Sequence, residues 1–91
     1  MSARRTREPK FLTAMRNRGV VVRLVGRISH GKRDKRYVVW QLGPRGWDAV
    51  LYTAAGRSVN TINFGLKGTP TQLDSDNAFA QFVAALNIEG R

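Results

Sequence analysis

Four runs of strand-forming residues, separated by connections too short to hold a helix, constrain the fold of this chain. The runs are 20–29, 36–42, 47–53 and 58–66, and β-branched or aromatic residues recur along each of them. A connection of a few residues joins antiparallel neighbours, whereas parallel strands need a long crossover. We therefore expect a four-stranded, mainly antiparallel sheet in which each strand lies beside the next one in the chain.

The alternation of side chains predicts which residues share a face of this sheet. Strict alternation along 20–29 places Arg23 and Arg27 on one face, about 13 Å apart at ~3.3 Å per residue. In the next strand Tyr37 shares a face with Lys35 and Gln41. If the two faces coincide, the sheet presents arginines around one aromatic ring, and Tyr37 becomes a stacking platform for an unpaired base.

Helical signals flank the four runs. Pro9 is a favourable first helical residue and Gly19 a plausible C-cap, which predicts a short helix over 9–18. A second helix follows a cap at Asp74 or Ser75 and extends to about residue 87. Its apolar residues fall at i, i+3, i+4 and i+7, namely Phe79, Phe82, Val83 and Leu86.

Together these elements predict one small α+β domain over residues 9–91, preceded by a flexible basic arm over residues 1–8. The expected architecture is a four-stranded, mainly antiparallel meander with a short N-terminal helix and a packed amphipathic C-terminal helix. No apolar run approaches the ~20 residues needed to span a bilayer, so we expect no membrane partner and a cytoplasmic location.

The positive charge is confined to the first part of the chain. Residues 1–36 hold 12 basic and 2 acidic side chains, whereas residues 37–91 hold 4 of each sign. Nine of the twelve are arginine, whose planar fork binds phosphate and stacks on bases. We expect them, with Tyr37, to bind nucleic acid. The candidate residues are Arg4, Arg5, Arg7, Lys10, Arg16, Arg18, Arg23, Arg27, Lys32, Arg33, Lys35, Arg36 and Tyr37.

The sequence is interpreted as a non-enzymatic nucleic-acid-binding protein, with DNA slightly favoured over RNA. Asp74 and Asp76 would repel phosphate, so the nucleic acid should approach the side away from the C-terminal helix. One alternative is a structural protein that docks on an acidic protein or within a viral or ribonucleoprotein assembly. The small neutral outer face of the C-terminal helix leaves a homo-oligomer open as well.

Catalytic chemistry has few candidates. The chain has no cysteine and a single histidine, His30, and lacks a cluster of metal ligands, so we expect neither a metal nor a cofactor. The order of elements and the lone His30 at the end of the first strand resemble the small HicA-type toxin ribonucleases. That resemblance implies a metal-independent ribonuclease using His30 as a further alternative. In this chain Arg27 and Ile28 separate Gly26 from Ser29 and His30, whereas the family has the three residues side by side.

Overall fold

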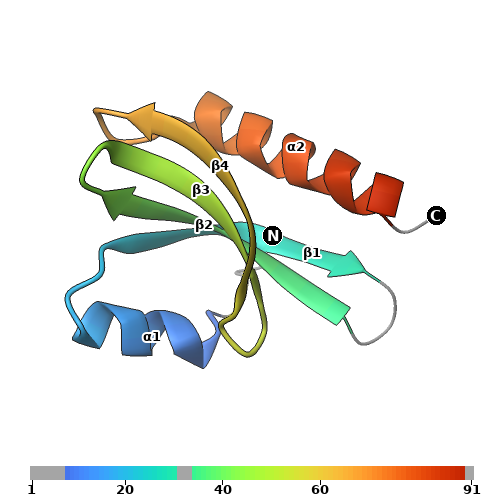
Figure 1. Cartoon of the computed structure of the whole chain (residues 1–91), viewed down its shortest axis with the longest axis horizontal. Coiled ribbons are helices and arrows are strands. Elements are labelled where there is room, and N and C mark those ends of the chain that lie inside the picture. The colour runs from blue at the N-terminus through green and yellow to red at the C-terminus, as the bar shows by residue number, and fades with distance from the viewer. Residues whose placement is uncertain (1–7, 31–33, 90–91) are drawn as a thin grey trace, which may run out of the picture.

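The computed structural model describes residues 8–30 and 34–89 of the 91-residue chain and confirms the α+β architecture. The four strands form one open sheet in the order β1-β2-β3-β4, and every neighbouring pair is antiparallel (Figure 1). Residues 1–7 of the expected basic arm lie outside the described residues. The elements in chain order are α1 (Lys10–Asn17), β1 (Val22–His30), β2 (Asp34–Gly43), β3 (Gly46–Thr53), β4 (Ser58–Leu66) and α2 (Gln72–Glu89).

The two helices lie on opposite faces of the sheet, so the central strands are buried on both sides (Figure 1). Four consecutive residues of β2, 37–40, and four of β3, 49–52, are buried. We call the side of the sheet that carries α1 the α1 face, and the opposite side the α2 face. Strands buried on both faces read as continuous apolar runs, which is the pattern of 37–40 and 49–52.

On the α1 face the core is built around Leu12, which is fully buried. Leu12 and Met15 of α1 pack with side chains from β1, β2 and β3. The ring of Phe11 lies edge-on to Tyr37, with 6.1 Å between the centroids, and 5.1 Å from the centroid of Tyr52. An eight-residue helix is marginal by itself, so this packing is what stabilises α1.

On the α2 face the core is built around Phe82, which is also fully buried. The helix begins earlier than the sequence pattern indicates, because Thr71 rather than Asp74 or Ser75 caps it. The Thr71 hydroxyl accepts a hydrogen bond from the Asp74 backbone N–H, and the Asp74 carboxylate accepts one from the Thr71 backbone N–H. This reciprocal arrangement is a capping box and fixes the start of α2. None of the described helices is long and apolar enough to span a bilayer.

A β-bulge in β1 overturns the expected alternation of that strand. Leu24 pairs with Val39 and Gly26 with Val38, so Val25 is an extra residue opposite β2. An inserted residue moves every later side chain to the other face. Arg23 pairs with Trp40 on the α2 face, whereas Arg27 pairs with Tyr37 on the α1 face. The prediction that Arg23 and Arg27 share a face is therefore wrong.

Candidate nucleic-acid interface

The cations expected to bind nucleic acid divide between the two faces. Lys10, Arg16 and Arg18 belong to α1 or its end, and Arg27 and Lys35 lie on the α1 face beside the start of that helix. Arg27 of β1 pairs with Tyr37 of β2, and Lys35 precedes Tyr37 by two positions. Arg27 and Lys35 are therefore diagonal neighbours on the same face, about 7–8 Å apart. All five are exposed. The α1 face thus keeps a group of exposed cations from two elements distant in the chain.

Arg23 and Arg36 lie on the α2 face instead. Arg23 lines a polar hollow of about 210 Å³ together with Thr71, Gln72 and Ser75, at the start of α2. Arg36 packs beside Ala85 and Leu86 and donates a hydrogen bond to Asp34 at 2.8 Å. These two arginines are separated from Arg27 and Lys35 by the sheet itself.

Ion pairs neutralise only part of this charge. Arg16 pairs with Glu8 at 2.6 Å, and the hydrogen bond from Arg16 lowers the pKa of Glu8 below its usual value. The second pair is Arg36 with Asp34. Within 8–30 and 34–89, the other cations of the α1 face, Lys10, Arg18, Arg27 and Lys35, form no ion pair. The positive charge of these four side chains is therefore free to meet an anion.

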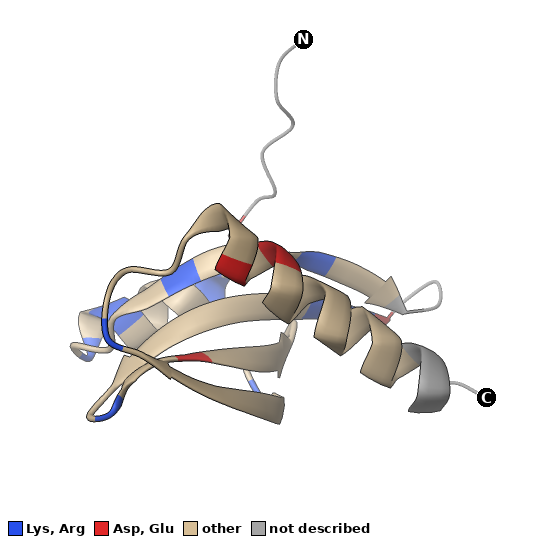
Figure 2. Ribbon diagram, turned by 90° about the horizontal axis from the view of Figure 1, so that it is seen from above, with Lys and Arg blue, Asp and Glu red and all other residues tan. Residues whose placement is uncertain are grey.

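The carboxylates are either engaged or remote from this group of cations. Asp74 accepts hydrogen bonds from Thr71, and Asp76 accepts one from Gln72, both at the start of α2. Figure 2 shows these acidic positions on the first turns of α2. Asp48 accepts a hydrogen bond from the Gly65 backbone N–H at 2.9 Å. The helix that would repel phosphate therefore lies across the sheet from Arg27 and Lys35.

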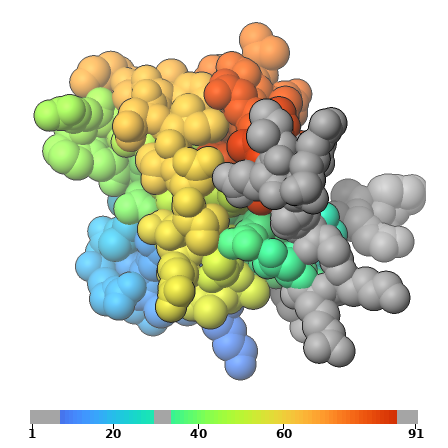
Figure 3. All heavy atoms as spheres, turned by 45° about the vertical axis from the view of Figure 1, so that its right-hand side comes forward, coloured from blue at the N-terminus to red at the C-terminus, as the bar shows by residue number. Residues whose placement is uncertain are grey.

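The α1 helix leaves part of its face uncovered, and a hollow of about 230 Å³ opens there over β3 and β4. Figure 3 shows β4 as a ridge, with α1 and the β2–β3 turn on one side and α2 on the other. We call the hollow the β3–β4 groove. It is lined by Gln41, Gly43, Asp48, Val50, Tyr52, Ser58 and Thr61.

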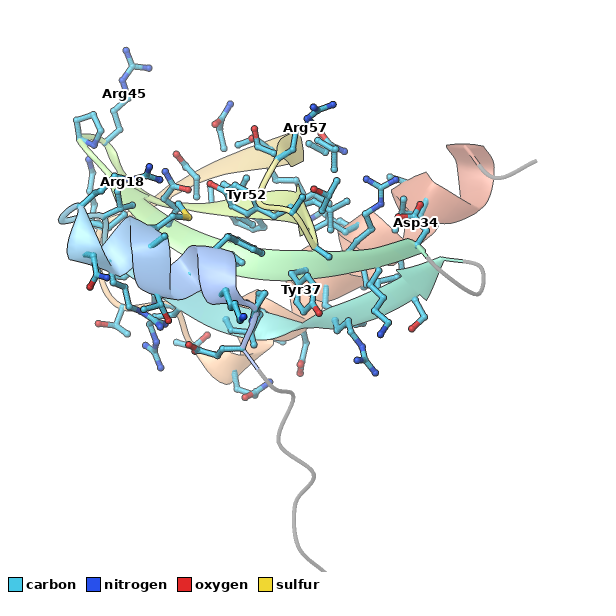
Figure 4. All side chains as sticks on the ribbon, turned by 90° about the horizontal axis from the view of Figure 1, so that it is seen from below. Arg18, Asp34, Tyr37, Arg45, Tyr52 and Arg57 are labelled. Carbon is cyan, nitrogen blue, oxygen red and sulfur yellow. The ribbon has the colours of Figure 1, made fainter. Side chains whose placement is uncertain are left out.

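Three arginines surround this groove. Figure 4 shows Tyr52 between Arg18 at the end of α1 and Arg57 in the β3–β4 turn, with Arg45 extending outward from the tip of the β2–β3 turn. All three arginines are exposed, and none forms an ion pair with the part of the chain that the structure describes. Arg45 and Arg57 belong to residues 37–91, whose net charge is zero, and they are absent from the candidates predicted from the sequence.

A hydrogen bond fixes two of the groove side chains. The Tyr52 hydroxyl donates to Gln41 Oε1 at 2.5 Å, and burial raises the pKa of Tyr52 above its usual value. The Gln41 amide N–H groups point to no acceptor among the described residues. The groove therefore combines a held amide with the charge of three surrounding arginines.

The structure contradicts the expected exposure of Tyr37. Only 8% of its surface is exposed, because the ring packs under Phe11 of α1. No base can stack on it in this arrangement, so Tyr37 is removed from the candidate interface.

Some candidates cannot be placed. Arg4, Arg5, Arg7, Lys32 and Arg33 lie outside the described residues, as does the side chain of His30 at the end of β1. In the described part of the chain no three histidine or carboxylate side chains gather into a potential metal site.

The β3–β4 groove is not among the sites predicted from the sequence, although polar residues within apolar strand runs indicate it. Gln41 and Asp48 are polar residues within the otherwise apolar runs 37–42 and 47–52, and Thr61 and Asn63 alternate with Ile62 and Phe64. Such positions mark a strand face that is not fully buried.

Comparison of the sequence with protein-family models and curated proteins, and of the fold with solved structures, finds no significant match.

Proposed function

We propose that this chain is a non-enzymatic nucleic-acid-binding protein of the cytoplasm, and that it contacts nucleic acid through the α1 face. One observation carries the proposal: Lys10, Arg18, Arg27 and Lys35 are exposed on that face without an ion pair in the described residues. When lysine and arginine side chains neutralise phosphates, the counterions condensed on the nucleic acid are released, and this release supplies much of the binding affinity.

The position of the acidic residues supports the same orientation. Asp74 and Asp76 lie at the start of α2, on the opposite side of the sheet. A duplex or a single strand lying along the α1 face avoids both carboxylates, whereas one lying on α2 meets them first. The proposal therefore specifies a side of the molecule as well as a class of partner.

Salt dependence tests this proposal. Fluorescence anisotropy with labelled single-stranded DNA, duplex DNA and single-stranded RNA should show an affinity that falls steeply with salt. If about six cations contact duplex phosphates, log K should fall against log salt with a slope near −5. A flat response would contradict phosphate binding.

A competitor separates nucleic acid from acidic proteins in general. Unlabelled polyglutamate at the same charge concentration should displace the labelled strand poorly, because it offers neither phosphate forks nor bases. Displacement as efficient as that by unlabelled nucleic acid would favour an acidic protein partner and count against the proposal.

A further inference from the structure

The β3–β4 groove is sized for a single ring rather than for a helix or a duplex. Its volume of about 230 Å³ is below the range of about 300–1,000 Å³ usual for pockets that enclose drug-sized ligands. Its lining is mainly polar, with an amide, a carboxylate and hydroxyl groups, and Val50 contributes an apolar surface. A flat heterocycle with polar edges fits this composition better than an alkyl chain does.

Two side chains of the groove floor are held in place and each retains an unused polar group. Gln41 Oε1 accepts from the Tyr52 hydroxyl, which leaves its Nε2 as a donor. Asp48 Oδ1 accepts from the Gly65 backbone N–H, which leaves Oδ2 as an acceptor. Because each bond holds one end of its side chain, the remaining group is positioned in advance of any ligand.

These two groups are direct neighbours. Gln41 of β2 pairs with Asp48 of β3, and residues directly opposite each other have Cβ atoms about 4.5–5.5 Å apart. A donor beside an acceptor matches the Watson–Crick edge of an unpaired base. Adenine and cytosine offer an exocyclic amino group beside a ring nitrogen, and guanine, thymine and uracil offer a ring N–H beside a carbonyl.

The surrounding arginines fit the rest of a nucleotide. Arg18, Arg45 and Arg57 are exposed around the groove, and their long side chains suit contacts to the phosphates on either side of a base (Figure 4). A base inside a duplex is stacked and paired, so it reaches the groove only from a single strand or after flipping out.

From this arrangement we infer that the β3–β4 groove binds an unpaired nucleobase, whose Watson–Crick edge contacts Gln41 and Asp48. The inference rests on the proposed function, because it names the part of a nucleic acid that this face selects. It predicts that a single-stranded oligonucleotide binds about tenfold more tightly than an abasic oligonucleotide of the same length and charge, since one good base contact is worth about 1–3 kcal/mol.

The substitution Asp48→Asn tests the acceptor directly. Asparagine keeps an oxygen for the Gly65 N–H but replaces the free acceptor with an amide donor. The tenfold preference for the base-carrying over the abasic oligonucleotide should disappear. The matched control is Asp76→Asn, which makes the same chemical change on α2 and should keep the preference.

A second variant guards against loss of folding, because Asp48 also holds β4 in place. Thr61→Val removes a groove hydroxyl without changing the size of the side chain, and should weaken single-strand binding several-fold at unchanged thermal stability. Equal affinity of the parent chain for the abasic and the base-carrying oligonucleotide overturns the inference but leaves the proposed function standing. Absence of binding to any strand overturns both.

Discussion

The Tyr52 hydroxyl lies at the boundary between the buried sheet and the groove. Its ring packs against Phe11 of α1, and its hydroxyl donates to Gln41 Oε1 at 2.5 Å. Burial raises the pKa of this phenol above its ordinary value near 10. A single side chain thus links the packing of α1 to the orientation of the amide that faces the groove.

The raised pKa of Tyr52 predicts a stability change at high pH. Its contribution is fully present below the pKa of the unfolded state and is lost as the pH rises through the higher folded pKa, because the unfolded chain ionises first. Tyr52→Phe should remove this dependence and, at neutral pH, cost about 0.5–1.5 kcal/mol through the lost hydrogen bond. Urea unfolding of parent and variant at about pH 7 and about pH 11 measures both effects. Identical losses of stability between the two pH values would contradict the assignment to Tyr52.

At the scale of elements, α1 is held against the sheet by a close contact with the β3–β4 turn. Gly56 has a φ of +92°, and a Cβ atom placed there would lie 2.8 Å from Cβ of Phe11. Gly19, at the end of α1, has a similar φ of +88° but open space around it. The β3–β4 turn and α1 therefore touch at Gly56, where Phe11 leaves no room for a side chain.

These two glycines predict a measurable difference. Gly19→Ala should cost about 1–2 kcal/mol of unfolding free energy, because only its left-handed backbone is disfavoured. Gly56→Ala carries the same backbone cost and also displaces Phe11, so its loss should be clearly larger. Chemical denaturation of both variants measures the difference, and equal losses would show that α1 does not press on the turn.

The elements themselves were predictable from the sequence to within a few residues. Strand propensity and short connections gave the four strands and their order, since these signals depend only on neighbours in the chain. The start of α2 was missed because Thr71 and Asp74 cap it together, a pairing that competes with the simpler choices Asp74 and Ser75. The sequence thus shows which residues can cap a helix, but it does not show which of several neighbouring candidates forms the cap.

The candidate site was less predictable because it depends on contacts between distant segments. The bulge at Val25 is set by how β1 pairs with β2, and it alone decides that Arg23 and Arg27 face opposite ways. The burial of Tyr37 depends on which face α1 covers, which an apolar sequence over 37–40 leaves open. The β3–β4 groove is lined by residues of β2, β3 and β4 that the eight-residue α1 does not cover, so its boundary depends on contacts between distant segments.

For the molecule as a whole, the net charge of +10 is not spread evenly around one sheet. The α1 face carries Arg27 and Lys35 without ion pairs in the described residues, and the α2 face carries the acidic start of α2. A sheet covered on both sides keeps these two surfaces apart. We therefore propose that the α1 face, rather than the total charge of the molecule, determines nucleic-acid binding.

The most direct test compares two arginines of the same strand. Arg27 and Arg23 are both exposed in β1 and both lack an ion pair in the described residues, but the bulge places them on opposite faces. Arg27→Gln should weaken binding to DNA or RNA and reduce the steepness of the log K against log salt line by about 0.9, whereas Arg23→Gln should leave both unchanged. Equal effects of the two substitutions, or a larger effect of Arg23→Gln, would contradict the claim that the α1 face is the binding side.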